Sequence, residues 1–182
     1  MIKKLLIALV VLVVVLVAAV AITSFAAGTD FTVSREVTIN KPRAEIYSYI
    51  KFLKNQNDWG PWFKREPTMQ QHFSGTDGTV GFVSHWIGNK DDVGEGEQEI
   101  KTLVENERMD TEVRFKRPFE STAQGSIALA PAGDASTKVK WTISGSMPRP
   151  MNLFLLVMDM DKAMGADIDE GLGNLKSIME KS

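Results

Sequence analysis

Hydrophobic residues follow three successive patterns along this chain. From Leu5 to Ala27 an apolar run contains no charged residue. From residue 31 to residue 145 apolar and polar residues mostly alternate, which predicts β-strands with one buried face. After Pro150 the apolar residues recur every three or four positions, which predicts an amphipathic helix. The patterns therefore indicate one N-terminal apolar segment followed by one α+β domain.

The apolar run is long enough to cross a membrane as a helix. At 1.5 Å per residue it would span roughly 34 Å, against about 30 Å for a hydrocarbon core. A cleaved signal peptide is the alternative, because Ser24-Phe25-Ala26 resembles a cleavage site. Such peptides have apolar cores of only about 7–15 residues, so the length favours a retained anchor.

The flanking charges predict the orientation of this segment. Lys3 and Lys4 precede it, which places the N-terminus in the cytoplasm and the domain outside. We therefore expect a membrane anchor at residues 1–28, with membrane contact through residues 5–27, and a folded domain at residues 29–182. The expected location is a bacterial inner membrane, with the domain facing the periplasm.

The alternating region is predicted to form an antiparallel sheet covered by the last helix. Pro42 suits the first turn of a short helix over residues 44–53. The long helix, predicted over 151–181, is the one element large enough to cover the apolar face of the sheet. The expected fold is thus a curved sheet wrapped around a C-terminal helix. The strands are predicted at 31–40, 69–74, 79–87, 94–105, 108–117, 119–130 and 136–145.

Local motifs accompany this order of elements in the segments 37–47, 59–62, 94–98, 138–141, 158–162 and 171–176. Together they resemble the helix-grip fold of the START-like superfamily, also described as SRPBCC or polyketide cyclase/dehydrase-like. The resemblance covers about residues 31–182 and implies a hydrophobic cavity between the sheet and the C-terminal helix. The superfamily includes lipid carriers, hormone receptors and aromatase/cyclases, so the resemblance does not identify a ligand.

Composition excludes several classes of function. Lys3 and Lys4 are two of 21 basic residues, so the remaining chain carries 19 basic against 23 acidic residues. A mildly acidic domain without clustered Lys and Arg disfavours nucleic-acid binding. The chain has no cysteine, which excludes disulfides, thiolate metal sites and cysteine nucleophiles.

Large apolar side chains are the main candidates for the cavity wall. The aromatic group at 59–63 could gate a flat ligand or simply plug the end of the sheet. The methionines near the C-terminus could adapt to varied ligands or simply fill the core. Polar candidates at the cavity are Asp58, Gln98 and Gln124. The apolar candidates are Trp59, Trp62, Phe63, Phe82, Trp86, Phe115, Trp141, Phe154, Met160 and Met164.

Catalytic and metal-binding patterns are weak in this sequence. His72 and His85 have no acidic partner at a metal-ligand spacing. The carboxylates at 95, 97 and 99 share one strand face and are expected to be solvated. No G-x-S-x-G elbow or phosphate-binding glycine loop is present. We therefore expect no catalytic residues, no metal and no cofactor.

The sequence predicts a membrane-anchored START-like domain that binds a lipid or other hydrophobic small molecule without catalysis. One alternative is a cyclase/dehydratase-like enzyme, which would need Asp58, Gln98 and Gln124 to converge on a substrate. A second alternative is a structural or protein-interaction module of the envelope with a filled core. The sequence names no protein partner.

Overall fold

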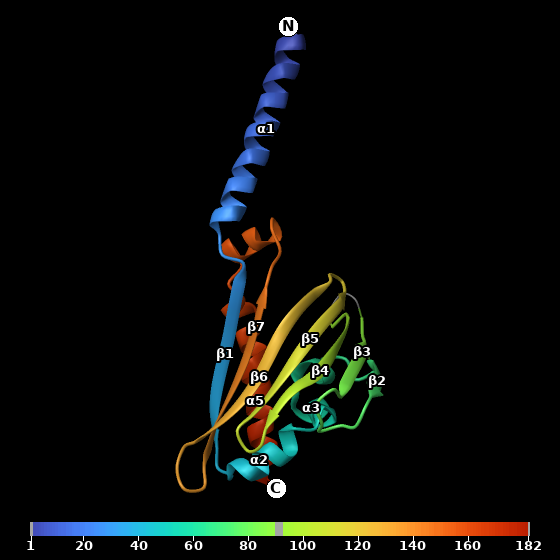
Figure 1. Ribbon diagram of the computed structural model, residues 1–182, viewed down its shortest axis with the longest axis vertical. Helices are drawn as coiled ribbons and strands as arrows, with labels where there is room; N and C mark the ends of the chain where they lie inside the picture. Colours follow the sequence, from blue (N-terminus) through green and yellow to red (C-terminus); the bar gives the residue numbers. More distant parts are fainter. Residues whose placement is uncertain (1, 90–92, 182) are drawn as a thin grey trace. The chain divides into compact units, whose positions relative to one another are not determined.

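The structure, a computed structural model, describes residues 2–89 and 93–181. The connection between the strands predicted at 79–87 and 94–105 therefore lies partly outside the described residues. The elements follow the predicted order closely (Figure 1). The helices are α1 (Ile2–Ala26), α2 (Arg43–Ile50), η1 (Leu53–Asn55), α3 (Gln56–Trp59), α4 (Pro61–Arg65), η2 (Met151–Leu156) and α5 (Met160–Lys181). The strands are β1 (Asp30–Ile39), β2 (Gln70–Ser74), β3 (Val83–Ile87), β4 (Glu95–Val104), β5 (Arg108–Arg117), β6 (Ser121–Pro131) and β7 (Thr137–Ser146).

Within the described residues, these strands form one seven-stranded sheet in the order β1-β7-β6-β5-β4-β3-β2. Strands β2 to β7 are successive antiparallel neighbours, and β1 joins the far edge beside β7. Burial alternates clearly along β6, where Ala123, Ile127 and Leu129 are buried and Gln124 is exposed. One face of the sheet therefore belongs to the core, as alternation predicts.

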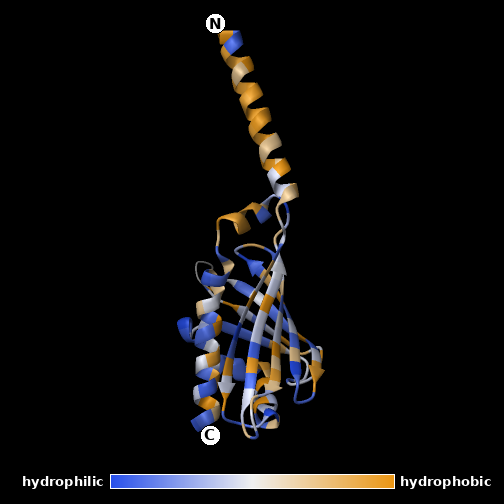
Figure 2. Cartoon of the chain, turned by 90° about the vertical axis from the view of Figure 1, so that its left-hand side faces the viewer, coloured by the Kyte–Doolittle hydropathy of each residue, from blue (hydrophilic) through white to orange (hydrophobic). Residues whose placement is uncertain are grey.

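Helix α5 covers that apolar face. Its buried side chains include Ile168, Leu172 and Leu175, which join Ile100 and Val139 of the sheet in one core cluster. Its hydrophobic and hydrophilic residues alternate along the helix, whereas α1 is hydrophobic over nearly its whole length (Figure 2). The predicted α+β fold, with a long C-terminal helix against an antiparallel sheet, is confirmed.

A buried glycine lets an arginine of β1 hold α5. Arg35 donates from Nη1 to Asp161 at 2.7 Å and from Nε to Asp169 at 3.0 Å. Gly165 lies between these aspartates on the same helix face, and a Cβ there would come within 2.1 Å of the guanidinium. The Arg35 hydrogen bond lowers the pKa of Asp161. The spacing Asp-x₃-Gly-x₃-Asp on one face of α5 thus leaves room for the Arg35 side chain between the two aspartates.

The contacts divide the chain into two compact units. The first contains the chain up to Phe31 together with Ser146–Asp159, and the second contains Thr32–Gly145 together with the chain from Met160 onward. The predicted continuous helix over 151–181 is wrong, because η2 and α5 are separate elements. The spacing of three to four residues between apolar positions continues across the break. Asn152 nevertheless belongs to the first unit, where it is fully buried and hydrogen-bonded to α1.

Candidate ligand-binding site

A cavity of about 230 Å³ lies in the second unit, bordered by the inner face of the sheet, α4 and α5. Its wall is mainly aromatic and aliphatic. Seven predicted side chains line it: Trp62, Phe63, Trp86, Gln98, Phe115, Trp141 and Met164. Further apolar lining comes from Leu53, Met69, Val93, Val113, Ala123 and Ile143.

Two glycines make room for side chains that line the cavity. Gly96 of β4 pairs with Trp86 of β3, and a Cβ at Gly96 would approach the indole to 2.6 Å. At Gly125 of β6 a Cβ would lie 2.7 Å from the Thr111 hydroxyl. Both neighbours line the cavity. Because Gly96 has no side chain, the Trp86 ring can lie over β4 and form part of the wall.

Three indoles meet at the α5 side of the cavity. The Trp141 ring makes edge contacts with Trp59, at 5.1 Å and 75°, and with Trp62, at 5.8 Å and 83°. Trp59 is 1% exposed, and its Nε1 has no hydrogen-bond partner among the described residues. Trp141 therefore belongs both to the packed core and to the cavity wall.

A small polar cluster interrupts the apolar wall. The Gln98 amide donates to the Thr111 hydroxyl at 3.1 Å, and Ser84 stands opposite Gln98 in the β3–β4 register. Thr111 and Ser84 are 3% and 7% exposed. A glutamine amide also carries a second N–H and an acceptor oxygen. This cluster can therefore hydrogen-bond one polar group of a bound molecule.

An ion pair joins the two helices beside the cavity. Arg65 of α4 donates to Asp167 of α5 through both terminal nitrogens, one of them at 3.1 Å. Glu170 lies 3.7 Å from the same guanidinium. Asp167 is also a lining residue. The pair therefore ties α4, which carries Trp62 and Phe63, to α5.

Four predicted apolar side chains do not line the cavity. Trp59 and Phe82 are buried in the core, each 1% exposed, and Met160 packs partly against that core. Phe154 is 54% exposed in η2, so its predicted place in the cavity is wrong. The error follows from the predicted continuous helix, which would have turned Phe154 towards the sheet.

Two predicted polar residues also lie elsewhere. Gln124 is on the outer face of β6 and donates to Glu112 at 3.3 Å, because the alternation directs its neighbours Ala123 and Gly125 inward. Asp58 is exposed and accepts a hydrogen bond from Tyr49 at 3.2 Å. Burial and the Asp58 carboxylate raise the pKa of Tyr49 to about 12. The three polar candidates thus do not converge.

Some lining residues were not singled out from the sequence. These are chiefly Gln56, Ser84, Thr111 and Asp167. Ser84 and Thr111 occupy inward-facing positions of strands whose residues alternate between the two faces of the sheet. A polar residue at a position where this alternation predicts burial could therefore have identified them. The Arg65–Asp167 ion pair depends on how α4 and α5 pack together, so the sequence of neither helix alone predicts it.

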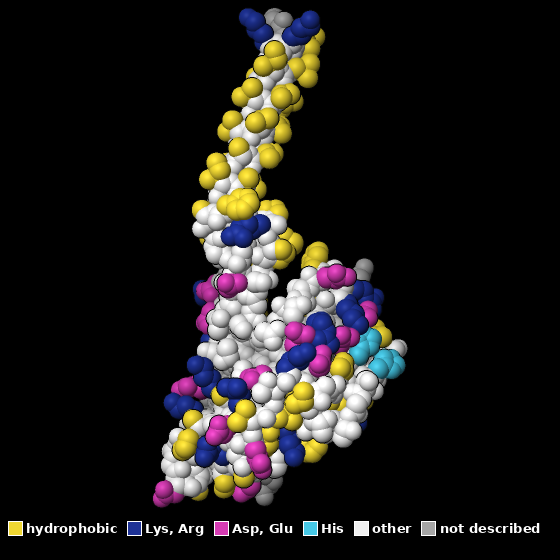
Figure 3. Space-filling model, viewed as in Figure 1, with side chains coloured by type: hydrophobic (Ala, Val, Ile, Leu, Met, Phe, Trp, Pro, Cys, Tyr) yellow, Lys and Arg dark blue, Asp and Glu magenta, His cyan; other side chains and the backbone are white. Residues whose placement is uncertain are grey.

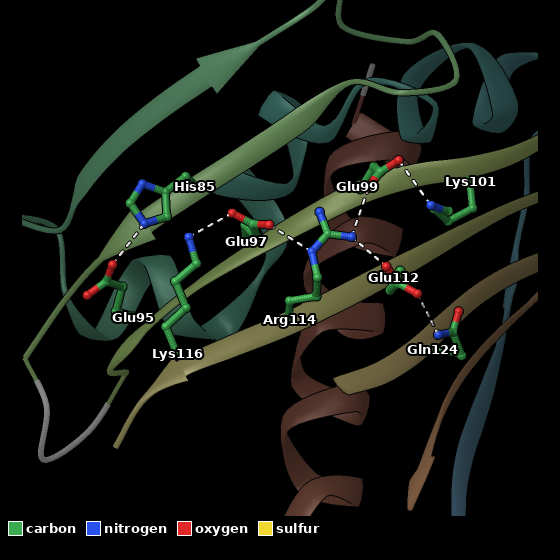
Figure 4. Close-up of polar contacts among 9 residues, drawn as sticks. All are labelled: His85, Glu95, Glu97, Glu99, Lys101, Glu112, Arg114, Lys116 and Gln124. Atoms are coloured by element: carbon green, nitrogen blue, oxygen red, sulfur yellow. Dashed lines mark hydrogen bonds and ion pairs between the residues drawn. The ribbon is translucent and has the colours of Figure 1, made fainter. Parts of the chain in front are cut away.

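The outer face of the sheet carries a network of charges (Figure 4). Arg114 lies at 2.7 Å from Glu97 and 2.8 Å from Glu99, and it also contacts Glu112. Hydrogen bonds from Arg114 lower the pKa of Glu99 and Glu112, while those from Lys116 and then Arg114 lower that of Glu97. His85 bonds Glu95 at 3.1 Å on the same face. These groups point away from the cavity.

This network predicts a loss of stability in acid. Unfolded glutamates protonate near pH 4.3, whereas the native pKa values are lower, so the contribution is full above that pH and declines as the pH falls below it. Arg114→Gln should lower the melting temperature at pH 7, and its difference from the parent protein should narrow by about pH 3. The control Arg108→Gln removes a more exposed pair with Asp110 on the same strand. A difference for Arg114→Gln that stays constant with pH would contradict this account.

Among residues 2–89 and 93–181, no group of three or more His, Cys, Asp or Glu side chains is arranged to hold a metal ion.

Comparisons with known proteins agree with this geometry. The sequence model of the family described as polyketide cyclase / dehydrase and lipid transport matches residues 30–180. No curated protein matches the sequence. Truncated norcoclaurine synthase from Thalictrum flavum has a similar fold, with a TM-score of 0.62 and 10% identity over 85% of this chain and 96% of that one.

Two bacterial structures are similar in the same way. An uncharacterised protein from Rhizobium leguminosarum has a TM-score of 0.61 and 12% identity, covering 86% of this chain and 98% of its own. The Aha1 dimer from Colwellia psychrerythraea has a TM-score of 0.56 and 15% identity, covering 82% and 96%. At these identities the likeness concerns the fold alone.

Proposed function

Because the chain belongs to the polyketide cyclase / dehydrase and lipid transport family, whose START-like fold typically binds hydrophobic ligands, we propose that it holds a compact hydrophobic molecule in this cavity. The observation that carries the proposal is an open apolar space inside a folded core. Well-packed interiors have few voids larger than a water molecule. A cavity of about 230 Å³ therefore favours ligand binding over a structural role with a filled core.

The dimensions of the cavity narrow the class of ligand. Pockets for drug-sized molecules are about 300–1,000 Å³, and this cavity is smaller. The proposed ligand is thus a small apolar compound or a single-chain lipid, rather than a whole two-chain phospholipid. Gln98, with Thr111 and Ser84 beside it, would bond one hydroxyl or carbonyl group of that ligand.

Retention in the membrane is the second part of the proposal. Helix α1 is long and apolar enough to cross a bilayer, and its only charged residues are Lys3 and Lys4 at the N-terminal end. We propose that α1 remains as an anchor and that the domain faces the outside. The protein would then take up an apolar molecule next to a membrane without transforming it.

The intrinsic fluorescence of the tryptophans provides a test of the proposed ligand site. Three of the four line the cavity, and the fourth contacts Trp141. Helix α1 contains none. Titrating the full chain in detergent micelles with 1-bromonaphthalene should quench this fluorescence saturably, because bromine quenches on contact. Naphthalene is the matched control. Quenching that rises linearly without saturation would mean that the probe stays in the micelle and would refute the proposal.

The same titration tests the polar cluster. Replacing Gln98 by leucine should weaken binding of 6-bromo-2-naphthol by up to about tenfold, since one hydrogen bond is worth about 0.5–1.5 kcal/mol. Binding of 1-bromonaphthalene, which has no hydroxyl, should stay within about twofold. An equal effect on both probes would show that the variant changes the cavity shape and not the recognition of a polar group.

A further inference from the structure

Large hydrophobic side chains are exposed together in the short segment between β7 and α5. We call Met151, Phe154, Leu156, Val157 and Met158 the η2 patch; their exposed fractions range from 43% to 84%. Outside α1 and this patch, the exposed large hydrophobics of the described residues are Phe73, Val80 and Phe119, and no two of them are neighbours in sequence. Clustered apolar exposure of this kind marks an interaction surface.

Hydrogen bonds tie this segment to the end of α1. The Asn152 amide donates to the backbone oxygens of Ser24, Ala27 and Gly28 at 2.8, 3.2 and 3.3 Å. In return, the Ser24 hydroxyl donates to the Asn152 side-chain oxygen at 2.7 Å. Asn152 and Ser24 are 0% and 2% exposed. Asn152 therefore caps carbonyl groups that a helix leaves unsatisfied at its C-terminus.

The position of this tie along α1 corresponds to a membrane surface. Starting from Leu5, the first residue after the lysines, a helix crosses a hydrocarbon core of about 30 Å in roughly 20 residues. That distance ends near Ser24. The η2 patch is thus attached to the anchor at the level where the chain leaves the hydrocarbon. Figure 3 shows hydrophobic side chains along α1 as far as its C-terminal end.

The charge of the segment also suits a membrane interface. Residues 146–158 contain no acidic residue, and Arg149 is their only charged one. Arg149 donates to the Ser24 carbonyl oxygen at 3.1 Å and lies 5.3 Å from the Phe25 ring centre. An arginine beside apolar side chains can place its guanidinium among lipid phosphates while its stem remains in the apolar layer.

We propose that the η2 patch inserts into the interface of the leaflet from which α1 emerges, held there by Asn152. The proposal rests on the membrane-spanning role proposed above for α1. Its partner is the lipid bilayer itself, in the manner of short interfacial segments with an apolar face. The first unit would therefore hold the membrane at two places, a spanning helix and an interfacial segment.

Depth measurements with single labels test this inference, because the chain has no cysteine of its own. Val157→Cys, Leu12→Cys and Ala135→Cys would be labelled with an environment-sensitive fluorophore in the full chain. The protein is reconstituted in phosphatidylcholine–phosphatidylglycerol vesicles containing lipids with a nitroxide near the headgroup or near the chain end. Val157 is 84% exposed, so the label should not disturb the fold.

The expected result is distinct for each label. The label at Val157 should be quenched more by the shallow nitroxide, that at Leu12 more by the deep one, and that at Ala135, in a polar turn, by neither. Adding Asn152→Ala should reduce quenching at Val157 and leave Leu12 unchanged. An unquenched label at Val157 with a quenched one at Leu12 would overturn the inference and leave the anchor intact. If both were unquenched, the spanning role of α1 would fail as well.

Discussion

Replacing Trp141 by alanine is expected to lower the free energy of unfolding by about 3–5 kcal/mol, the usual range for a buried tryptophan. The side chain is 4% exposed and contacts both Trp59 and Trp62. Its removal would leave a void continuous with the existing cavity. Because domains are stable by only about 5–15 kcal/mol, much of the native stability would be lost.

Urea unfolding of the full chain in detergent micelles, followed by near-ultraviolet circular dichroism, measures this loss. The matched control is Trp86→Ala, which removes a cavity indole that is only partly buried and should cost clearly less. Equal losses for the two variants would contradict the central packing role of Trp141. A loss below about 1 kcal/mol for Trp141→Ala would contradict it outright.

The second large effect is expected at Ala123. Phenylalanine at this lining position would fill much of a cavity of about 230 Å³, and we expect at least a tenfold loss of 1-bromonaphthalene affinity. Overpacking costs about 1–3 kcal/mol, so the variant should still fold. Circular dichroism checks that point before binding is measured.

Thr122→Phe is the control for this substitution. It introduces the same ring one residue away in β6, where the side chain is exposed on the other face of the sheet. Its affinity for the probe should match that of the parent protein. If Thr122→Phe weakened binding as much as Ala123→Phe, the probe would be reporting the integrity of the sheet and not occupancy of the cavity.

The fold was predictable because apolar residues recur with a clear period over long stretches of the chain. Alternation over β4 to β7 identified both the strands and their inward faces, and the family resemblance supplied the helix-grip arrangement. The outward charges at Glu95, Glu97 and Glu99 follow from the same two-residue period. Strands therefore carry enough local information to predict the faces of this sheet.

Two failures of prediction arose from tertiary contacts, whereas the third, at Gln124, went against a local pattern that was correct. The apolar spacing of α5 extends back through Phe154 and Val157, yet Asn152 binds the end of α1 and the chain forms a separate short helix there. Gln124 was assigned to the cavity although its own strand alternation turns it outward. The Arg65–Asp167 pair joins residues 102 positions apart and could not be read from either segment.

Mass spectrometry of an organic extract tests the central claim most directly. The full chain and the Ala123→Phe and Thr122→Phe variants would be purified from membranes in the same detergent and extracted. The account predicts a compact apolar molecule with one polar group in near-stoichiometric amount, present with the parent protein and Thr122→Phe and depleted at least tenfold with Ala123→Phe. Extracts that contain only bulk membrane lipid, in equal amounts for all three proteins, would contradict it.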